Sequence, residues 1–488
     1  MGLLPSGERR QTGLSGPVVA SVGLVLLALA PLIRGGNRHA ALIVLEIIAL
    51  VMMPMLAWRV TTREGVSRAQ SVGIIVLALS PFWVGLFQLV PLPPDIWAML
   101  PGHGPYVDAL TSVQAPTGVW RPASVTPDAT WLSLLAGLPV AATFLLAWLV
   151  SGPQLVLLLR AVTFFAVFQA VMGLLQVVFL PELFFGAGPS NRAIGSFANP
   201  NHLASYLAMV LPLIILFFRQ ALALRSRPGS ESAARSRNRS QSRLSKARAG
   251  SPAAATAWGL ALFLVLAAML ATLSRAGLAS GLIVGLAAAL LLPSGETSAP
   301  QRRWRLAAVV AFGVLVSVSV GLDGLLQRIA VAANDADEAT RLQLFMATWE
   351  GARAFWPFGS GLGSYASVFL RFKPSGISGY AEYAHSDYVQ LLMECGALFV
   401  ALAAVAAWLI ARQFRPLARR LHRHPGDPDA LLQISCGLGL LAVFLHSWLD
   451  FNLHIPANAM LAAFLFGAFL RPVKLRSGAD PQRHAYPG

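Results

Sequence analysis

Runs of about 20 apolar residues recur along this chain, and they limit its fold more than any other feature. Such a run crosses a bilayer as a helix, because lipid offers no hydrogen-bond partner to bare backbone groups. The pattern predicts an all-α, polytopic membrane protein with about twelve spans, near residues 14–33, 40–58, 71–91, 131–150, 154–180, 202–218, 254–273, 276–292, 306–322, 388–411, 430–449 and 456–470.

Composition agrees with this class of fold. The chain is 56% hydrophobic and only 12% charged, whereas soluble proteins carry about 25% charged residues. The net charge of +16 does not indicate nucleic-acid binding, because the positive residues lie between spans and the basic segment 225–252 contains no aromatic residue. Cys395 and Cys436 have neither zinc-ligand spacing nor a disulfide framework, so we interpret them as small apolar residues.

Lys and Arg are distributed unevenly between alternate loops. If the N-terminus is cytoplasmic, most of the 37 Lys and Arg residues fall in cytoplasmic segments, as the positive-inside rule requires. Both termini are then cytoplasmic. We expect four parts: residues 1–322 with spans one to nine and a disordered loop at 225–252, a large outer catalytic loop with short helices at 323–387, three further spans at 388–470, and a cytoplasmic tail at 471–488.

Two arginines on the outer side are candidate anion ligands. Arg275 lies at a hairpin tip between two spans, where it serves either as an interfacial anchor or as a bidentate phosphate ligand. Arg341 begins a pattern with apolar residues at helical spacing, which predicts an amphipathic helix on the membrane surface. The glycine run at 359–363 that follows suits either a phosphate cradle or a close backbone approach.

His385 is the candidate catalytic residue. It precedes the expected span at 388–411, and Tyr380, Tyr383 and Tyr388 surround it in sequence. A neutral imidazole can take a proton from a sugar hydroxyl near neutral pH, although a lone histidine is more often structural or simply exposed.

Two further sets of polar residues lie in or near the spans. His446, Asp450 and His454 recur every four residues, a spacing that on a helix would put all three on one face, as metal ligands would be. Pro456 follows soon, however, so residues 452–454 can already be loop, and we favour a hydrogen-bond cluster that links the last two spans. Glu46 is the clearest acid inside a span. A single acid of this kind is weak evidence for a proton pathway.

Five stretches together resemble the O-antigen ligase and polymerase superfamily of bacterial membrane enzymes. They are residues 195–207, 274–277, the region from Arg341 to 363, residues 385–396 and residues 446–456. The resemblance implies a metal-independent, inverting glycosyltransferase without a cofactor, in the bacterial inner membrane with a periplasmic active site. Arg275 and Arg341 would hold the diphosphate of a polyprenyl-linked glycan, and His385 would activate the acceptor hydroxyl. Asn199, Asn201, Tyr388, His446 and Asp450 would support the site.

The acceptor stays open at this point. A ligase uses lipid A–core, and a polymerase uses another carrier-linked glycan; both need the same arginines and base. We favour a ligase. A transporter of lipid-linked glycan is the alternative of a different class, but it predicts inverted repeats and several charges inside spans, and the sequence offers neither.

Overall fold

The computed structural model describes residues 15–63, 67–179, 192–225, 252–292, 336–377 and 379–472. Several expected features lie outside these residues: the span at 306–322, most of the basic segment 225–252, the beginning of the 323–387 loop, and the tail beyond 472.

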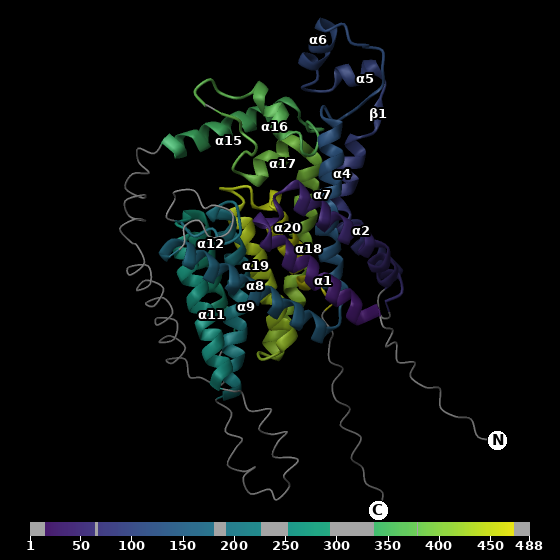
Figure 1. Ribbon diagram of the computed structural model, residues 1–488. Coiled ribbons are helices and arrows are strands. Elements are labelled where there is room, and N and C mark those ends of the chain that lie inside the picture. Colours follow the sequence, from purple (N-terminus) through teal and green to yellow (C-terminus); the bar gives the residue numbers. More distant parts are fainter. Residues whose placement is uncertain are drawn as a thin grey trace, which may run out of the picture.

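Long apolar helices form a bundle (Figure 1). In the described part of the chain, seven helices are long and apolar enough to cross a membrane: α2 (His39–Thr61), α7 (Pro127–Leu149), α8 (Gly152–Val178), α9 (Pro200–Arg225), α11 (Pro252–Ala271), α18 (Ala397–Arg423) and α19 (Pro428–His446). An eighth span results if α3 (Arg68–Ala78) and α4 (Ser80–Gln88), which meet at 60°, cross together. Three shorter apolar helices join them: α1 (Ser15–Leu32), α12 (Arg275–Leu291) and α20 (Pro456–Phe469). The prediction of a polytopic helical membrane protein is confirmed.

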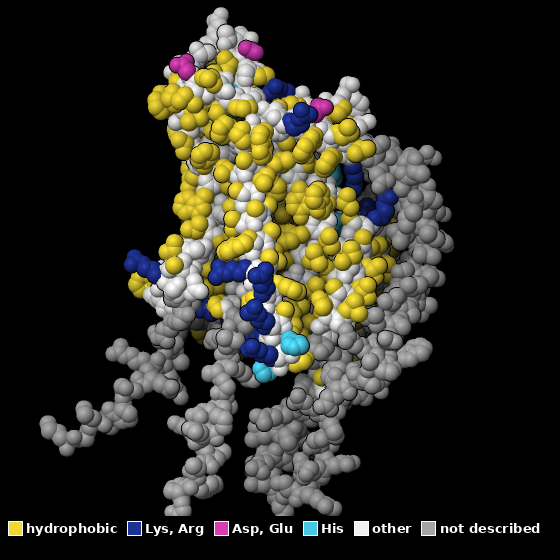
Figure 2. Space-filling view, turned by 180° about the vertical axis from the view of Figure 1, so that it is seen from behind, with side chains coloured by type: hydrophobic (Ala, Val, Ile, Leu, Met, Phe, Trp, Pro, Cys, Tyr) yellow, Lys and Arg dark blue, Asp and Glu magenta, His cyan; other side chains and the backbone are white. Residues whose placement is uncertain are grey.

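Helix α9 is central to the bundle and packs against α8, α11, α12, α19 and α20. Glycines permit the closest helix contacts, because a Cβ on Gly439 of α19 would lie 2.4 Å from the carbonyl oxygen of Met209 on α9. Apolar side chains cover the outer surface of the bundle, and many of the arginines on this face gather at its lower end (Figure 2).

A layer of short elements caps the other end of the bundle (Figure 1). It contains β1 (Pro91–Leu92), α5 (Pro94–Met99), α6 (Gly104–Ser112), β2 (Arg121–Pro122), α15 (Ala336–Ala354), α16 (Tyr365–Val368), η4 (Phe369–Arg371) and α17 (Asp387–Cys395). The two strands pair antiparallel, with Leu92 opposite Arg121. The cap has its own apolar core, in which Phe355, Tyr365, Phe369 and Met393 are almost completely buried. Two further turns of 3₁₀ helix, η1 (Arg34–Gly36) and η5 (Asn452–His454), lie between helices of the bundle.

The expected span at 388–411 is divided by Gly396. This residue has φ 56° and ψ −133°, so α17 ends before it and α18 begins at Ala397. Helix α17 belongs to the cap, because its buried Asp387, Gln390 and Glu394 need protein partners that lipid cannot supply. The membrane span therefore starts at Ala397 rather than at residue 388.

Helix α15 forms as expected. Leu342 and Met346, which belong to its apolar pattern, are 61% and 60% exposed on the surface of the protein. A second face packs against α17 and contains Leu344 together with the small residues Ala347, Thr348, Gly351 and Ala352. A Cβ on Gly351 would lie 2.9 Å from the sulfur of Met393, which shows how close the two helices are.

The glycine run at 359–363 is used for a close backbone approach. A Cβ on Gly359 would lie 2.3 Å from the carbonyl oxygen of Glu394. The amide of Gly361 donates to that carbonyl oxygen, and the amide of Gly363 donates to the Glu394 carboxylate. Because α17 already occupies these two amides, the turn does not have the free amides of a phosphate cradle.

We predict that Gly396→Ala destabilises the protein. Its positive φ disfavours any side chain, and a Cβ would lie 2.2 Å from the carbonyl oxygen of Pro357. The expected cost is on the order of 2 kcal/mol, measured as a lower Tm of the protein in lipid nanodiscs. Gly376→Ala is the matched control, since a Cβ there meets nothing within 4 Å. Equal Tm values for the two variants would contradict this account of the break.

Candidate active site

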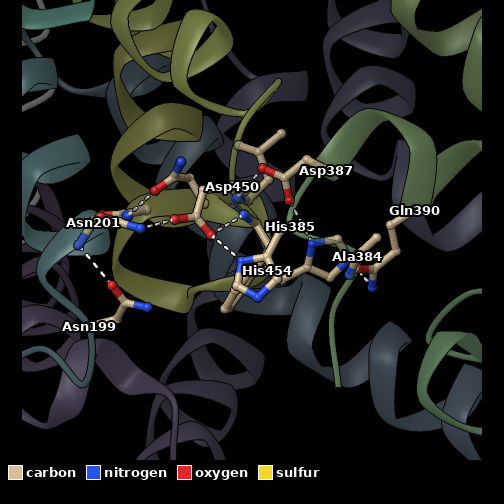
Figure 3. Close-up of polar contacts among 12 residues, drawn as sticks. Asn199, Asn201, Ala384, His385, Asp387, Gln390, Asp450 and His454 are labelled. Carbon is tan, nitrogen blue, oxygen red and sulfur yellow. Dashed lines mark hydrogen bonds and ion pairs between the residues drawn. The ribbon is translucent and has the colours of Figure 1, made fainter. Parts of the chain in front are cut away.

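The candidate site is built around the side chains of His385 and Asp450 (Figure 3). Nδ1 of His385 lies 3.4 Å from Oδ1 of Asp450. The carboxylate is completely buried, whereas the imidazole is 28% exposed. His385 has φ 52°, which is unusual for a residue with a side chain. Such strain persists where surrounding contacts over-determine the backbone, and it is concentrated at functional sites.

Backbone contacts on both sides hold His385 in this conformation. The amide of Ala384 donates to Oε1 of Gln390 at 3.0 Å. The amide of Asp387 donates to the carbonyl oxygens of Ser447, at 3.0 Å, and of Asp450, at 3.2 Å. The cap segment that carries His385 is therefore fixed directly to the turn that carries Asp450.

The second oxygen of Asp450 contacts helix α9. Nδ2 of Asn201 donates to Oδ2 of Asp450 at 2.6 Å, while the amide of Phe451 donates to Oδ1. Asn199 begins α9 by accepting a hydrogen bond from the amide of Asn201. Figure 3 shows Asn201 and His385 on opposite sides of the Asp450 carboxylate.

These contacts keep Asp450 ionised. Burial alone would raise the pKa of its carboxyl group, but the hydrogen bond from His385 and the nearby His202 and His446 rings lower it below the ordinary value. An ionised Asp450, 3.4 Å from Nδ1 of His385, favours the tautomer that carries the proton on Nδ1. That tautomer leaves Nε2 with a lone pair, as a general base requires.

His385 opens onto a cavity of about 400 Å³. Helix α15, the end of the loop before α17, the η1 turn and the start of α9 all contribute to its wall. The lining residues are Asn37, Ala198, Asn199, His202, Thr340, Leu344, Ile377, Tyr380, Ala381, Glu382, Tyr383, His385 and Phe451. The cavity is large enough for a small molecule and mixes polar with apolar walls.

A second imidazole–carboxylate pair lies behind the first. Nδ1 of His454 donates to Oδ1 of Asp387 at 2.6 Å, and Nε2 of His454 lies 3.0 Å from Nε2 of Gln390. Gln390 in turn donates to Glu394, whose carboxylate accepts from the amide of Tyr365. Burial raises the pKa of Glu394. The network joins η5, α17 and the glycine-rich turn.

His446, Asp450 and His454 do not share one helical face, because the helix ends before residues 452–454, as the nearby Pro456 indicated. Helix α19 ends at His446, Asp450 lies in the following turn, and His454 lies in η5 and contacts Asp387. Asp450 pairs with Asn201 and His385. Among the residues that the structure describes, no group of three or more His, Cys, Asp or Glu side chains is arranged to hold a metal ion.

Both predicted arginines lie near the end of the bundle that carries the cap. Arg275 is the first residue of α12, where Ser274 caps the helix by accepting from the amide of Gly277. The ring of His446 is adjacent, since a Cβ on Gly277 would lie 3.3 Å from its Cε1 atom. Arg341 is half-buried on α15, and its charge acts on the same ring. Neither arginine lines the cavity.

Tyr388 has a structural contact instead of a place in the cavity. Its hydroxyl donates to the carbonyl oxygen of Phe444 at 2.8 Å, and its ring packs against Trp448. Burial raises the pKa of Tyr388 to about 12, so the hydroxyl remains protonated and can donate this bond. Tyr388 thus fixes α17 to the end of α19.

Arg192 is a residue of the site that sequence reasoning missed. Its Nε donates to the carbonyl oxygen of Thr272 at 2.8 Å, and its Nη2 lies 3.3 Å from Oδ1 of Asn201. Arg192 therefore connects the turn before Arg275 with the asparagine that holds Asp450. The sequence contains one indication of this role. Arg192 is the only Lys or Arg in the loop 181–201, and it lies three residues before the stretch 195–207.

A comparison with protein families identifies the central part of the chain. Residues 260–404 match the family described as O-Antigen ligase. The match supports the predicted resemblance to the O-antigen ligase superfamily over this part of the chain. The O-antigen ligase domain includes Arg275, Arg341 and His385, whereas Asn201 and Asp450 come from outside it. No curated protein matches the chain.

The superfamily and the apolar helices together define the general class of this protein. It is a membrane protein with a domain of a family that suggests enzymes acting on glycans, and that family implies lipid-linked glycans and lipids as partners in general. The predicted resemblance to this superfamily is confirmed.

The Asp387–His454 pair predicts a pH-dependent contribution to stability. Burial alone lowers the pKa of His454, but the hydrogen bond and charge of Asp387 raise it above its ordinary value of 6.5. The contribution is therefore complete below about pH 6.5 and is lost as pH rises through the folded-state pKa. We expect His454→Gln to lower the Tm more near pH 5.5 than near pH 9. His424→Gln, at an exposed position directly after α18, is the control. A Tm difference independent of pH would contradict the raised pKa.

Proposed function

We propose that this protein transfers a glycan from a polyprenyl-diphosphate carrier to a hydroxyl group of an acceptor. One observation carries the proposal. Within the O-antigen ligase domain, the His385 imidazole opens onto a cavity and is backed by the buried Asp450 carboxylate. A general base that is oriented by a carboxylate has this arrangement.

His385 activates the acceptor in this proposal. Asp450 holds the Nδ1–H of His385 and stabilises the positive charge that forms on the ring. Nε2 takes the proton of the acceptor hydroxyl. The oxygen then attacks the anomeric carbon of the donor sugar.

Arginines stabilise the leaving diphosphate in this proposal. Arg275 stands at the N-terminus of α12, where the helix dipole also favours an anion, and Arg341 and Arg192 lie around the same end of the bundle. Guanidinium groups bind phosphate oxygens in a bidentate manner and can neutralise the developing charge without a metal ion. We therefore propose a metal-independent reaction.

The bonds change in a single displacement. The bond between the acceptor oxygen and the anomeric carbon forms while the bond from that carbon to the diphosphate oxygen breaks. The diphosphate leaves with the electron pair, and the proton remains on His385 until water removes it. Because attack and departure occur on opposite sides, the configuration at the anomeric carbon inverts.

The proposed location is the periplasmic face of the bacterial inner membrane. The positive-inside rule supports it, because arginines such as Arg412, Arg415, Arg419 and Arg423 are exposed at the end of α18 that lies furthest along the helix from the cap. With that end in the cytoplasm, the cap and His385 face the periplasm. Both termini are then cytoplasmic.

We predict that His385→Ala lowers the transfer rate by about 10²–10⁴-fold, because the acceptor hydroxyl loses its base. Binding of the carrier-linked glycan should persist, since the arginines remain. The measurements are product formation by the protein in nanodiscs and the donor Kd. His422→Ala, on the exposed end of α18, is the control and should transfer normally. Near-normal turnover of His385→Ala would remove the general-base assignment.

We propose a ligase that uses lipid A–core as acceptor, with a polysaccharide polymerase as the alternative. Deletion of the gene in its host separates the two. A ligase predicts that the long glycan is still made but is no longer attached to lipid A–core. Surface glycans that contain single repeats would instead indicate a polymerase.

A further inference from the structure

We propose that the cavity beside His385 is the binding subsite for a sugar unit of the acceptor, with Tyr380 as its stacking surface and Glu382, Thr340 and Asn37 as its hydroxyl ligands. The inference rests on the proposed glycosyl transfer, and it assigns one of the two substrates to a particular part of the site. These four residues are separate from the His385–Asp450 pair and from the arginines.

The cavity is built by segments that are far apart in sequence. Asn37 follows the η1 turn, Thr340 belongs to α15, and Tyr380 and Glu382 precede His385. Its volume of about 400 Å³ falls within the range of about 300–1,000 Å³ that is typical of small-molecule sites. A sugar unit can therefore enter it and place a hydroxyl beside His385.

The lining side chains suit a sugar better than a lipid chain. Amide, hydroxyl and carboxylate groups at Asn37, Thr340 and Glu382 supply both donors and acceptors, as a row of sugar hydroxyls requires. A pyranose ring also has an apolar face of C–H groups, which packs against an aromatic ring. Ile377 and Leu344 give the cavity further apolar wall.

Tyr380 is the aromatic ring available for this packing. Tyr383 also lines the cavity, but its ring stacks on Phe451 with centroids 4.1 Å apart and planes 7° apart. The Tyr380 side chain is 64% exposed. An exposed aromatic side chain on the wall of this cavity offers a large contact area with few rotatable bonds.

The position of His385 assigns the cavity to the acceptor rather than to the donor. In an inverting displacement, the nucleophile and the leaving group lie on opposite sides of the anomeric carbon. His385 lines the cavity, whereas Arg192, Arg275 and Arg341 do not. The hydroxyl that gives its proton to His385 therefore comes from the cavity, and the diphosphate remains on the side of the arginines.

Direct binding tests this assignment without requiring turnover. The probe is the delipidated surface oligosaccharide of the host, added to the full chain in nanodiscs, and its Kd is measured by saturation-transfer NMR. We expect Tyr380→Ala to raise this Kd about 3–10-fold and Tyr380→Phe to leave it within about twofold, since the ring remains. Glu382→Gln should also raise it. Trp120→Ala, an exposed aromatic of the cap outside the cavity, is the control and should change nothing.

The same variants are then assayed for transfer. We expect Tyr380→Ala to raise the acceptor KM by the same factor and to leave the Kd of polyprenyl diphosphate unchanged. Polyprenyl diphosphate should not displace the oligosaccharide, because the two occupy different sides of His385. Displacement, or a Kd and KM unaffected by both Tyr380→Ala and Glu382→Gln, would overturn the subsite. Tyr380-dependent binding by a wild-type protein that transfers nothing would support the subsite and contradict the glycosyltransferase instead.

Discussion

The contacts of the buried Asp450 carboxylate connect the helical bundle with the cap, and the candidate site depends on them. One oxygen accepts from Asn201 at the start of α9, and the other lies 3.4 Å from His385 in the segment before α17. An uncompensated charge at this depth would cost several kcal/mol, so the bundle and the cap must both be in place to satisfy it. The same contact that fixes the cap on the bundle also orients the candidate base.

The Asp387–His454 pair makes a second polar connection between the bundle and the cap. It connects η5 with α17, and Gln390 and Glu394 continue the connection to the glycine-rich turn. Asp387, Gln390 and Glu394 are buried and, with His454, are bonded to one another, so they hold the segment that carries His385 in place. Polar contacts therefore position the segments around the cavity, whereas apolar packing positions the helices below it.

The sequence predicted the helical membrane fold well, because apolar length alone identifies a span. It missed the break at Gly396, since the residues after 388 remain mostly apolar through the end of α17 and into α18. It also did not indicate that a second face of α15 packs against α17, because small residues such as Ala347 and Gly351 pack closely without standing out as hydrophobic. In both places the tertiary partner decided the outcome, and a local pattern carries no information about that partner.

The candidate site was predictable only in part, for a related reason. His385, Arg275 and Arg341 stood out locally, as a histidine among tyrosines and as arginines beside spans. The role of Arg192 and the pairing of Asp450 depend on contacts such as that between Asn201 and Asp450, which are 249 residues apart in sequence. The cavity likewise exists only after α15, η1 and the start of α9 have come together.

The proposed glycan transfer can be measured with purified components. The purified full chain in nanodiscs is supplied with a carrier-linked glycan and an acceptor, and both products are quantified. The account predicts that glycosylated acceptor and free polyprenyl diphosphate appear in equal amounts, and that neither forms without the acceptor. Movement of the carrier-linked glycan across the bilayer without either product would contradict it.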